Sequence, residues 1–127
     1  MNDIPLTIKE IQEGLLKKDF SAVNLVDAYL KRIEKQDKDI NSFITVTKEK
    51  AYNDAEKVDA LINELGKKAF DEYPLLGSVV GYKDLFLTKG VRSTAGAKLL
   101  TDYIPAYDAT VVQRLQKAGV IMIGKVN

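Results

Sequence analysis

Residues 108–123 read DATVVQRLQKAGVIMI and place a helix signal directly before a strand signal. Asp108 has the side chain of a helix cap, which predicts a helix over 109–118 that ends at the following glycine. The residues at 120–123 are all apolar, as in a strand that is covered on both faces. An earlier run at 79–82 is small or β-branched and also predicts a central strand. Two strands joined by a helical crossover form a parallel pair, so we expect an α/β layered fold.

The N-terminal half predicts helices that precede a short strand. Thr7 and Glu10 have the spacing of a capping box, and Ser21 can cap a second helix that runs to about Lys38. Both helices carry an apolar stripe at helical spacing, which predicts a hairpin with its charged faces in water. Aromatic and β-branched residues over 40–47 then predict a short strand.

A third helix is expected over 48–65, with Gly66 as the residue that ends it. The polar connection at 67–74 is the best candidate for a boundary between two subdomains. We therefore divide the chain into residues 1–66, a helical region with one short strand, and residues 67–127, the start of an α/β core. Together the two parts are expected to form one incomplete domain.

The composition excludes several kinds of chemistry. The 127 residues include neither histidine nor cysteine, so a Ser-His-Asp triad, a disulfide and a His or Cys metal site are impossible within them. The 19 basic and 18 acidic residues form no basic stripe with interleaved aromatic residues, so direct nucleic-acid binding is not expected. No apolar run reaches membrane-spanning length and the start does not resemble a signal peptide, which predicts a cytoplasmic location and no membrane association.

Lys83 is the leading candidate for a chemical role. It follows the predicted strand at 79–82, and a lysine buried there would have a lowered pKa and could act as a general base. The alternative is that Lys83 emerges at the end of the strand and pairs with a carboxylate such as that of Asp84.

Two other motifs have simpler explanations. Gly119, Gly124 and Lys125 have almost the spacing of a P-loop, but Val126 supplies no hydroxyl for Mg²⁺ and the residues between the glycines predict a strand. The small residues over 93–96 predict a turn-rich loop that could approach a substrate or hold Lys83 by a hydroxyl.

The second half contains the runs PLLG at 74–77, KD at 83–84, TKGVRSTAGAK at 88–98, PAYDATVV at 105–112 and IGKVN at 123–127. Together these runs resemble the amidase signature family, and most closely its tRNA-dependent amidotransferase A subunits. The resemblance covers nearly the whole chain, helical start included. It departs from the family at Ser78 and Val79, where Ile-Pro is usual, and at Leu85, where Asn is common.

The resemblance implies amide hydrolysis by a Ser–cis-Ser–Lys triad, with Lys83 in the position of the catalytic lysine. Both catalytic serines of the family lie downstream of Asn127, so we expect this chain alone to be inactive. The parent reaction would take ammonia from glutamine or asparagine to amidate mischarged tRNA. The resemblance implies B and C subunits as partners, with tRNA bound mainly by the B subunit. It implies no cofactor in this chain, with ATP and Mg²⁺ at a partner subunit.

Two alternatives remain open at this point. The chain could belong to a free-standing amidase that acts on other amides. It could also be a short non-catalytic domain that binds partners or self-associates through an incomplete sheet.

Overall fold

The computed structural model describes residues 4–127, which contain five α-helices, a short 3₁₀ helix and a three-stranded sheet. The chain order is α1 Ile8–Lys17, α2 Ala22–Ile40, β1 Phe43–Val46, α3 Lys48–Leu65, α4 Lys68–Glu72, β2 Val79–Lys83, η1 Lys98–Leu100, α5 Thr110–Lys117 and β3 Ile121–Val126. The predicted α/β class is confirmed. None of the helices in this described part of the chain is both long enough and apolar enough to cross a bilayer.

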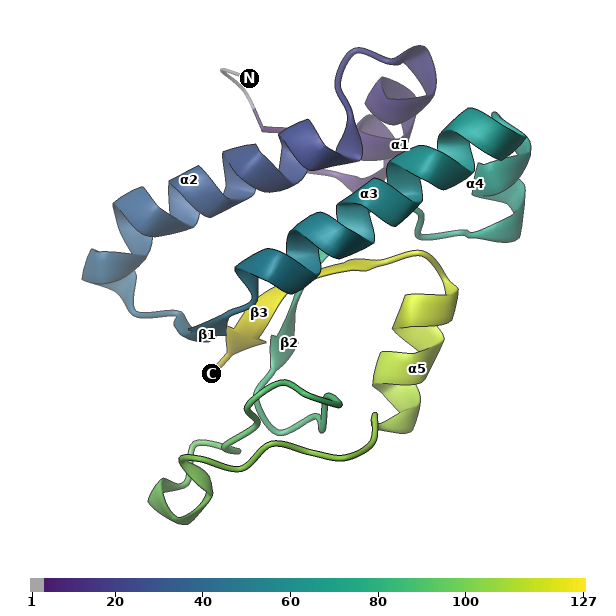
Figure 1. The fold of residues 1–127 in the computed structure, drawn as a ribbon. Helices are drawn as coiled ribbons and strands as arrows, with labels where there is room; N and C mark the ends of the chain where they lie inside the picture. The colour runs from purple at the N-terminus through teal and green to yellow at the C-terminus, as the bar shows by residue number, and fades with distance from the viewer. Residues whose placement is uncertain (1–3) are drawn as a thin grey trace.

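The sheet has the strand order β1-β3-β2, with β3 at its centre. β2 and β3 are parallel, as the sequence predicted, and β1 is antiparallel to β3. The expectation that 79–82 forms a central strand is wrong within residues 4–127, because β2 lies at the edge of the sheet. α2 and α3 lie across one face of the sheet, whereas α5 lies beside the other face (Figure 1). The connection from β2 to α5 extends well away from the helical layer in the same view.

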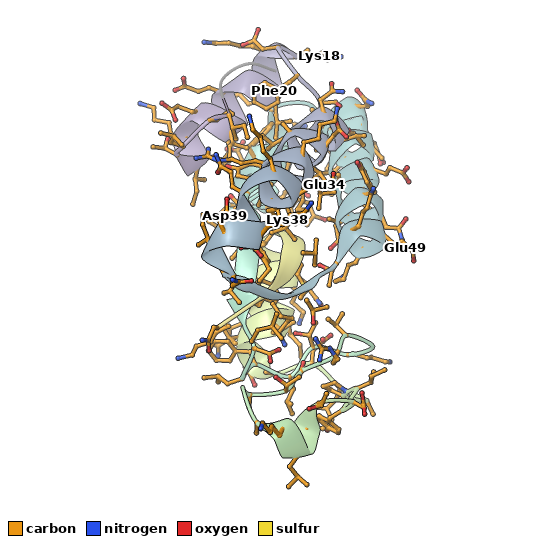
Figure 2. The ribbon with its side chains drawn as sticks, turned by 90° about the vertical axis from the view of Figure 1, so that its left-hand side faces the viewer. Lys18, Phe20, Glu34, Lys38, Asp39 and Glu49 are labelled. Atoms are coloured by element: carbon orange, nitrogen blue, oxygen red, sulfur yellow. The ribbon has the colours of Figure 1, made fainter. Side chains whose placement is uncertain are left out.

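Two apolar clusters hold these layers together, one on each face of the sheet. The larger cluster joins α1, α2 and α3 to Ile121 and Ile123 of β3. The smaller cluster joins Tyr82 of β2 and Met122 of β3 to Val112 of α5. The outer face of α2 is charged, and Figure 2 shows Glu34, Lys38 and Asp39 on it. This division follows from the amphipathic pattern of the helices.

The N-terminal capping signals are confirmed. Thr7 and Glu10 form a complete capping box at α1. The Ser21 side chain caps α2, and Asn24 reaches back to the backbone N–H of Ser21. α3 has the predicted bounds, and Gly66 ends it with a positive φ of 57°.

The polar connection at 67–74 contains the short helix α4. One local expectation is wrong. Asp108 does not cap α5, because its carboxylate accepts a hydrogen bond of 2.7 Å from the backbone N–H of Lys89. Ala109 occupies the cap position of α5 without any side-chain hydrogen bond.

A β-bulge in β3 changes the direction of its last side chains. Val80 of β2 pairs with Met122, but Gly81 pairs with Gly124, so Ile123 is an extra residue on β3. Lys125 consequently pairs with Tyr82 and points to the α5 face of the sheet. Regular alternation after Ile121 and Ile123 would have directed Lys125 into the helical core instead.

Candidate catalytic lysine and the buried polar cluster beside it

Lys83 is the last residue of β2, where it pairs with Val126 of β3. Its side chain is exposed, so of the two possibilities considered for this lysine the structure shows emergence at the end of the strand and not burial. Its pairing with Asp84 is not formed, however. Within residues 4–127 the Lys83 ammonium makes no ion pair or hydrogen bond, so it is free to meet a group that approaches from outside.

Asp84 follows Lys83 and lies almost wholly out of solvent. Its backbone N–H donates a 2.8 Å hydrogen bond to the carbonyl oxygen of Val126. Its carboxylate oxygen Oδ2 accepts from both the backbone N–H and the hydroxyl of Thr94, the former at 2.9 Å. These hydrogen bonds thus fix Asp84, the first residue after β2.

Lys125 is the charged partner of Asp84. Its side chain is fully buried, and its Nζ lies 3.6 Å from Oδ1 of Asp84. The same Nζ bonds to the carbonyl oxygen of Phe86 at 2.8 Å and to Oγ of Ser93 at 2.7 Å. Burial lowers the pKa of Lys125, and the Asp84 carboxylate opposes this effect. We call Asp84, Ser93, Thr94 and Lys125 the buried polar cluster.

The contact between Lys125 and Ser93 has the composition of a Ser–Lys pair, but its surroundings do not suit catalysis. Ser93 is only 2% exposed, so a substrate carbonyl cannot reach its Oγ. The hydroxyl of Ser93 also donates to the carbonyl oxygen of Val91 at 3.1 Å. The ammonium of Lys125 is surrounded by three oxygen atoms, which is the environment of a structural cation.

The loop at 93–96 therefore does hold a lysine by a hydroxyl, as the sequence suggested, but the lysine is Lys125 and not Lys83. The sequence reasoning considered Lys125 only as part of a P-loop, and the strand at 121–126 bears out the rejection of that motif. The sequence did contain a signal for these contacts of Lys125, because a lysine that follows an apolar run must have polar partners when it is buried.

An apolar groove lies on the opposite side of the sheet from this cluster. It has a volume of about 290 Å³ and runs between α2 and the strands, with Tyr29, Phe43, Val79 and Gly81 among its lining residues. Lys83 is two residues beyond Gly81 on β2, so its side chain leaves the strand on the face where the groove lies.

Comparison with known proteins agrees with this arrangement of strands and helices. The family model described as Amidase matches residues 24–127. This chain belongs to the amidase family. The match includes both lysines and the whole sheet, and only α1 and the start of α2 lie outside it.

Curated relatives of this amidase-family chain extend the similarity to α1. The A subunit of glutamyl-tRNA(Gln) amidotransferase from Azotobacter vinelandii is 47% identical over 122 residues, which are 96% of this chain and 24% of that protein. The corresponding protein from Acinetobacter baumannii is 43% identical over the same shares. The chain thus spans about a quarter of the length of the curated relatives it matches.

Solved structures show the same fold. The native peptide amidase of Stenotrophomonas maltophilia matches with a TM-score of 0.86 and 25% sequence identity, over 96% of this chain and 24% of that one. The fold of this amidase-family chain therefore recurs as one part of larger amidases.

Proposed function

We propose that this chain is the N-terminal part of a tRNA-dependent amidotransferase A subunit. The observation that carries the proposal is the 47% identity to the A subunit of glutamyl-tRNA(Gln) amidotransferase over nearly the whole chain. The reaction of the complete protein would hydrolyse the side-chain amide of glutamine or asparagine and release ammonia. A free-standing amidase is the runner-up, because a peptide amidase has this fold over 96% of the chain, with a TM-score of 0.86.

Within that reaction we assign Lys83 the role of proton acceptor. In the triad of the family, the neutral lysine takes the proton of a bridging serine, which in turn takes the proton of the attacking serine. The attacking oxygen bonds to the amide carbon, the proton held by the lysine passes to the amide nitrogen, the C–N bond breaks and ammonia leaves. Water then hydrolyses the acyl-serine ester and restores the serine. The exposed side chain of Lys83 supports this role, because incoming serine hydroxyls could reach its nitrogen.

The hydroxyl groups of this chain support the proposal that it is inactive alone. Ser21 caps α2, and the Ser42 hydroxyl donates to the Asp37 carboxylate at 2.6 Å. Ser78 and Ser93 are both 2% exposed. None of the four serines is thus available beside Lys83 as a nucleophile, and a base without a nucleophile gives no turnover.

The partners follow from the same proposal. Ammonia would pass to a B subunit that binds the mischarged tRNA, with a C subunit completing the complex. ATP and Mg²⁺ would act at the partner subunit. The chain by itself is also expected to self-associate, because β2 is an edge strand of the sheet within residues 4–127.

The experiment uses a hybrid amidotransferase in which residues 1–127 replace the matching segment of the Azotobacter vinelandii protein. The hybrid is assembled with the partner subunits of that organism, and ammonia release from glutamine is measured. We expect release by the hybrid, none by the 127-residue chain, and a loss of at least about 10³-fold in the hybrid with Lys83→Ala.

The exposed lysine Lys89 supplies the matched control, and Lys89→Ala should leave ammonia release unchanged. Release that survives Lys83→Ala would exclude the assigned role of Lys83. Hydrolysis of simple amides without amidation of tRNA would favour the free-standing amidase.

A further inference from the structure

Lys83 and Lys125 are at the ends of neighbouring parallel strands but point to opposite faces of the sheet. Lys83 pairs with Val126, whereas Lys125 pairs with Tyr82. The Lys83 ammonium is exposed, and the Lys125 ammonium is fully enclosed. The two lysines therefore lie at adjacent positions of the sheet but have different environments.

Lys125 contacts the segment after Lys83 at three separate residues. Its Nζ lies 3.6 Å from Oδ1 of Asp84, 2.8 Å from the carbonyl oxygen of Phe86 and 2.7 Å from Oγ of Ser93. One side chain of β3 thus connects both ends of the segment 84–93 to the sheet. The contacts with Asp84 and Ser93 form between buried side chains, where water does not compete for them, and the contact with Phe86 is partly buried.

The residue most tightly held is the one bonded directly to Lys83 in the chain. Asp84 donates its N–H to Val126, accepts two hydrogen bonds from Thr94 on its carboxylate and accepts one from Ala95 on its carbonyl oxygen. Asp84 cannot move without breaking these bonds. The backbone that carries Lys83 is therefore fixed on its C-terminal side by the buried polar cluster and on its N-terminal side by β2.

We propose that Lys125 is a positioning residue for the reaction of Lys83: by holding Asp84, Phe86 and Ser93 against β3, it fixes the place from which the Lys83 ammonium projects. This inference rests on the proposed function. Lys125 does not itself exchange protons with substrate, because its side chain has no exposed surface. Displacement of a catalytic group by about 1 Å can reduce a rate by about 100-fold, so loss of this anchor should affect turnover.

The first measurement uses the 127-residue chain with Lys125→Met. Amide hydrogen exchange should accelerate more at Thr94 and Ala95, whose N–H groups bond to Asp84, than at Leu25 and Leu30 of α2, where only the general loss of stability acts. Unchanged exchange at Thr94 and Ala95 would overturn the proposal. Uniformly faster exchange throughout would also overturn it, because Lys125 would then support the whole fold and not this segment.

The second measurement uses kinetics of the hybrid amidotransferase. Lys125→Met should lower kcat for ammonia release by at least about tenfold and change KM by less than about threefold. Lys117→Met, which replaces an exposed lysine of α5, is the matched control and should leave both constants unchanged. A folded Lys125→Met hybrid with the kcat of the parent would overturn the proposal.

Ser93→Ala is the second variant for the case that Lys125→Met fails to fold. It removes one bond of Lys125 but keeps the pair of charges, and it should lower kcat by about threefold or more with KM unchanged. A normal kcat in Ser93→Ala would then overturn the proposal. Failure of the proposed function has a different signature, since Lys83→Ala would retain ammonia release whatever the result at Lys125.

Discussion

The ammonium nitrogen of Lys125 lies 3.6 Å from Oδ1 of Asp84, and almost no solvent reaches either side chain. Removal of one charge from such a pair leaves the other buried without a counter-ion, which costs about 3–5 kcal/mol. We therefore expect Lys125→Met to lower the free energy of unfolding by about 3 kcal/mol or more. The double variant Asp84→Asn/Lys125→Met should also have a lower free energy of unfolding. Its decrease should be smaller, by at least about 1 kcal/mol, than the sum of the decreases in the two single variants. Urea unfolding of the wild type and three variants completes the cycle, and additive losses would show that the two charges are not coupled.

Gly124 should not accept a side chain. A Cβ on this residue would lie 2.5 Å from the carbonyl oxygen of Thr45 and 2.7 Å from Cδ1 of Phe43. Because β3 is the central strand, β1 cannot move away without losing its pairing. We expect Gly124→Ala to destabilise the chain by about 2–3 kcal/mol in urea unfolding.

Gly81→Ala is the control for this position, since its Cβ would meet only side chains, the nearest being that of Val126 at 3.1 Å. Neither glycine has a positive φ, so the comparison tests crowding alone. The loss at Gly81 should be below about 1 kcal/mol. Equal losses at the two sites would contradict the explanation.

Tyr82 has a buried hydroxyl with no hydrogen-bond partner among the described residues. An unsatisfied buried hydroxyl costs free energy, so Tyr82→Phe should raise the free energy of unfolding by up to about 1 kcal/mol near neutral pH. A clear destabilisation would mean that the hydroxyl has a partner after all.

The same variant should change the alkaline limit of stability. Burial raises the pKa of Tyr82 to about 12, with smaller contributions from Asp54 and Asp108. Tyr82 is therefore protonated in the folded chain at pH values where the unfolded chain has lost the proton. Its contribution to stability is present below about pH 10 and is lost as the pH rises toward about 12. Tyr82→Phe should show a smaller loss of stability over this range in urea unfolding at a series of pH values.

Asp37 should contribute to the acid limit of stability. The Ser42 hydroxyl and the backbone N–H groups of Ser42 and Phe43 hold the pKa of Asp37 below its usual value. A carboxylate with a lowered pKa in the folded state stabilises the fold above its ordinary pKa, and this stability is lost as the pH falls. Asp37→Asn should therefore flatten the decline in stability below about pH 5, measured by urea unfolding at a series of acid pH values.

The control for Asp37 is Asp39→Asn, on the outer face of α2 (Figure 2). This variant should leave the acid decline unchanged. An identical decline in wild type and Asp37→Asn would show that the Asp37–Ser42 contact does not persist in solution.

Periodicity and capping chemistry predicted most of the fold, because both are local. α3 has the predicted bounds, Thr7 and Ser21 cap the predicted helices, and β2 and β3 form the predicted parallel pair. Asp108 shows the limit of this reasoning. Its side chain can serve a helix cap or a distant N–H equally well, and only the folded loop brings the N–H of Lys89 within reach.

The site was harder to predict for a similar reason. The resemblance to the family identified Lys83 as a candidate. The exposure of its side chain at the end of β2 depends on which residues pack there, and the sequence of the strand does not determine this. The buried position of Lys125 was not predicted, because the bulge at Ile123 reverses the direction of its side chain and a single-residue bulge has no signature in an unbroken apolar run.

The three contacts of Lys125 also restrict how the length of this chain can vary among related proteins. Phe86 and Ser93 must both present an oxygen atom to one fixed nitrogen, so an inserted or deleted residue between Asp84 and Thr94 would misplace at least one of them. No such restriction applies around Leu99, which is 94% exposed. Insertions and deletions should therefore be tolerated after Thr94 and eliminated by selection between Asp84 and Thr94, where the segment that follows Lys83 has its length fixed by a side chain on another strand.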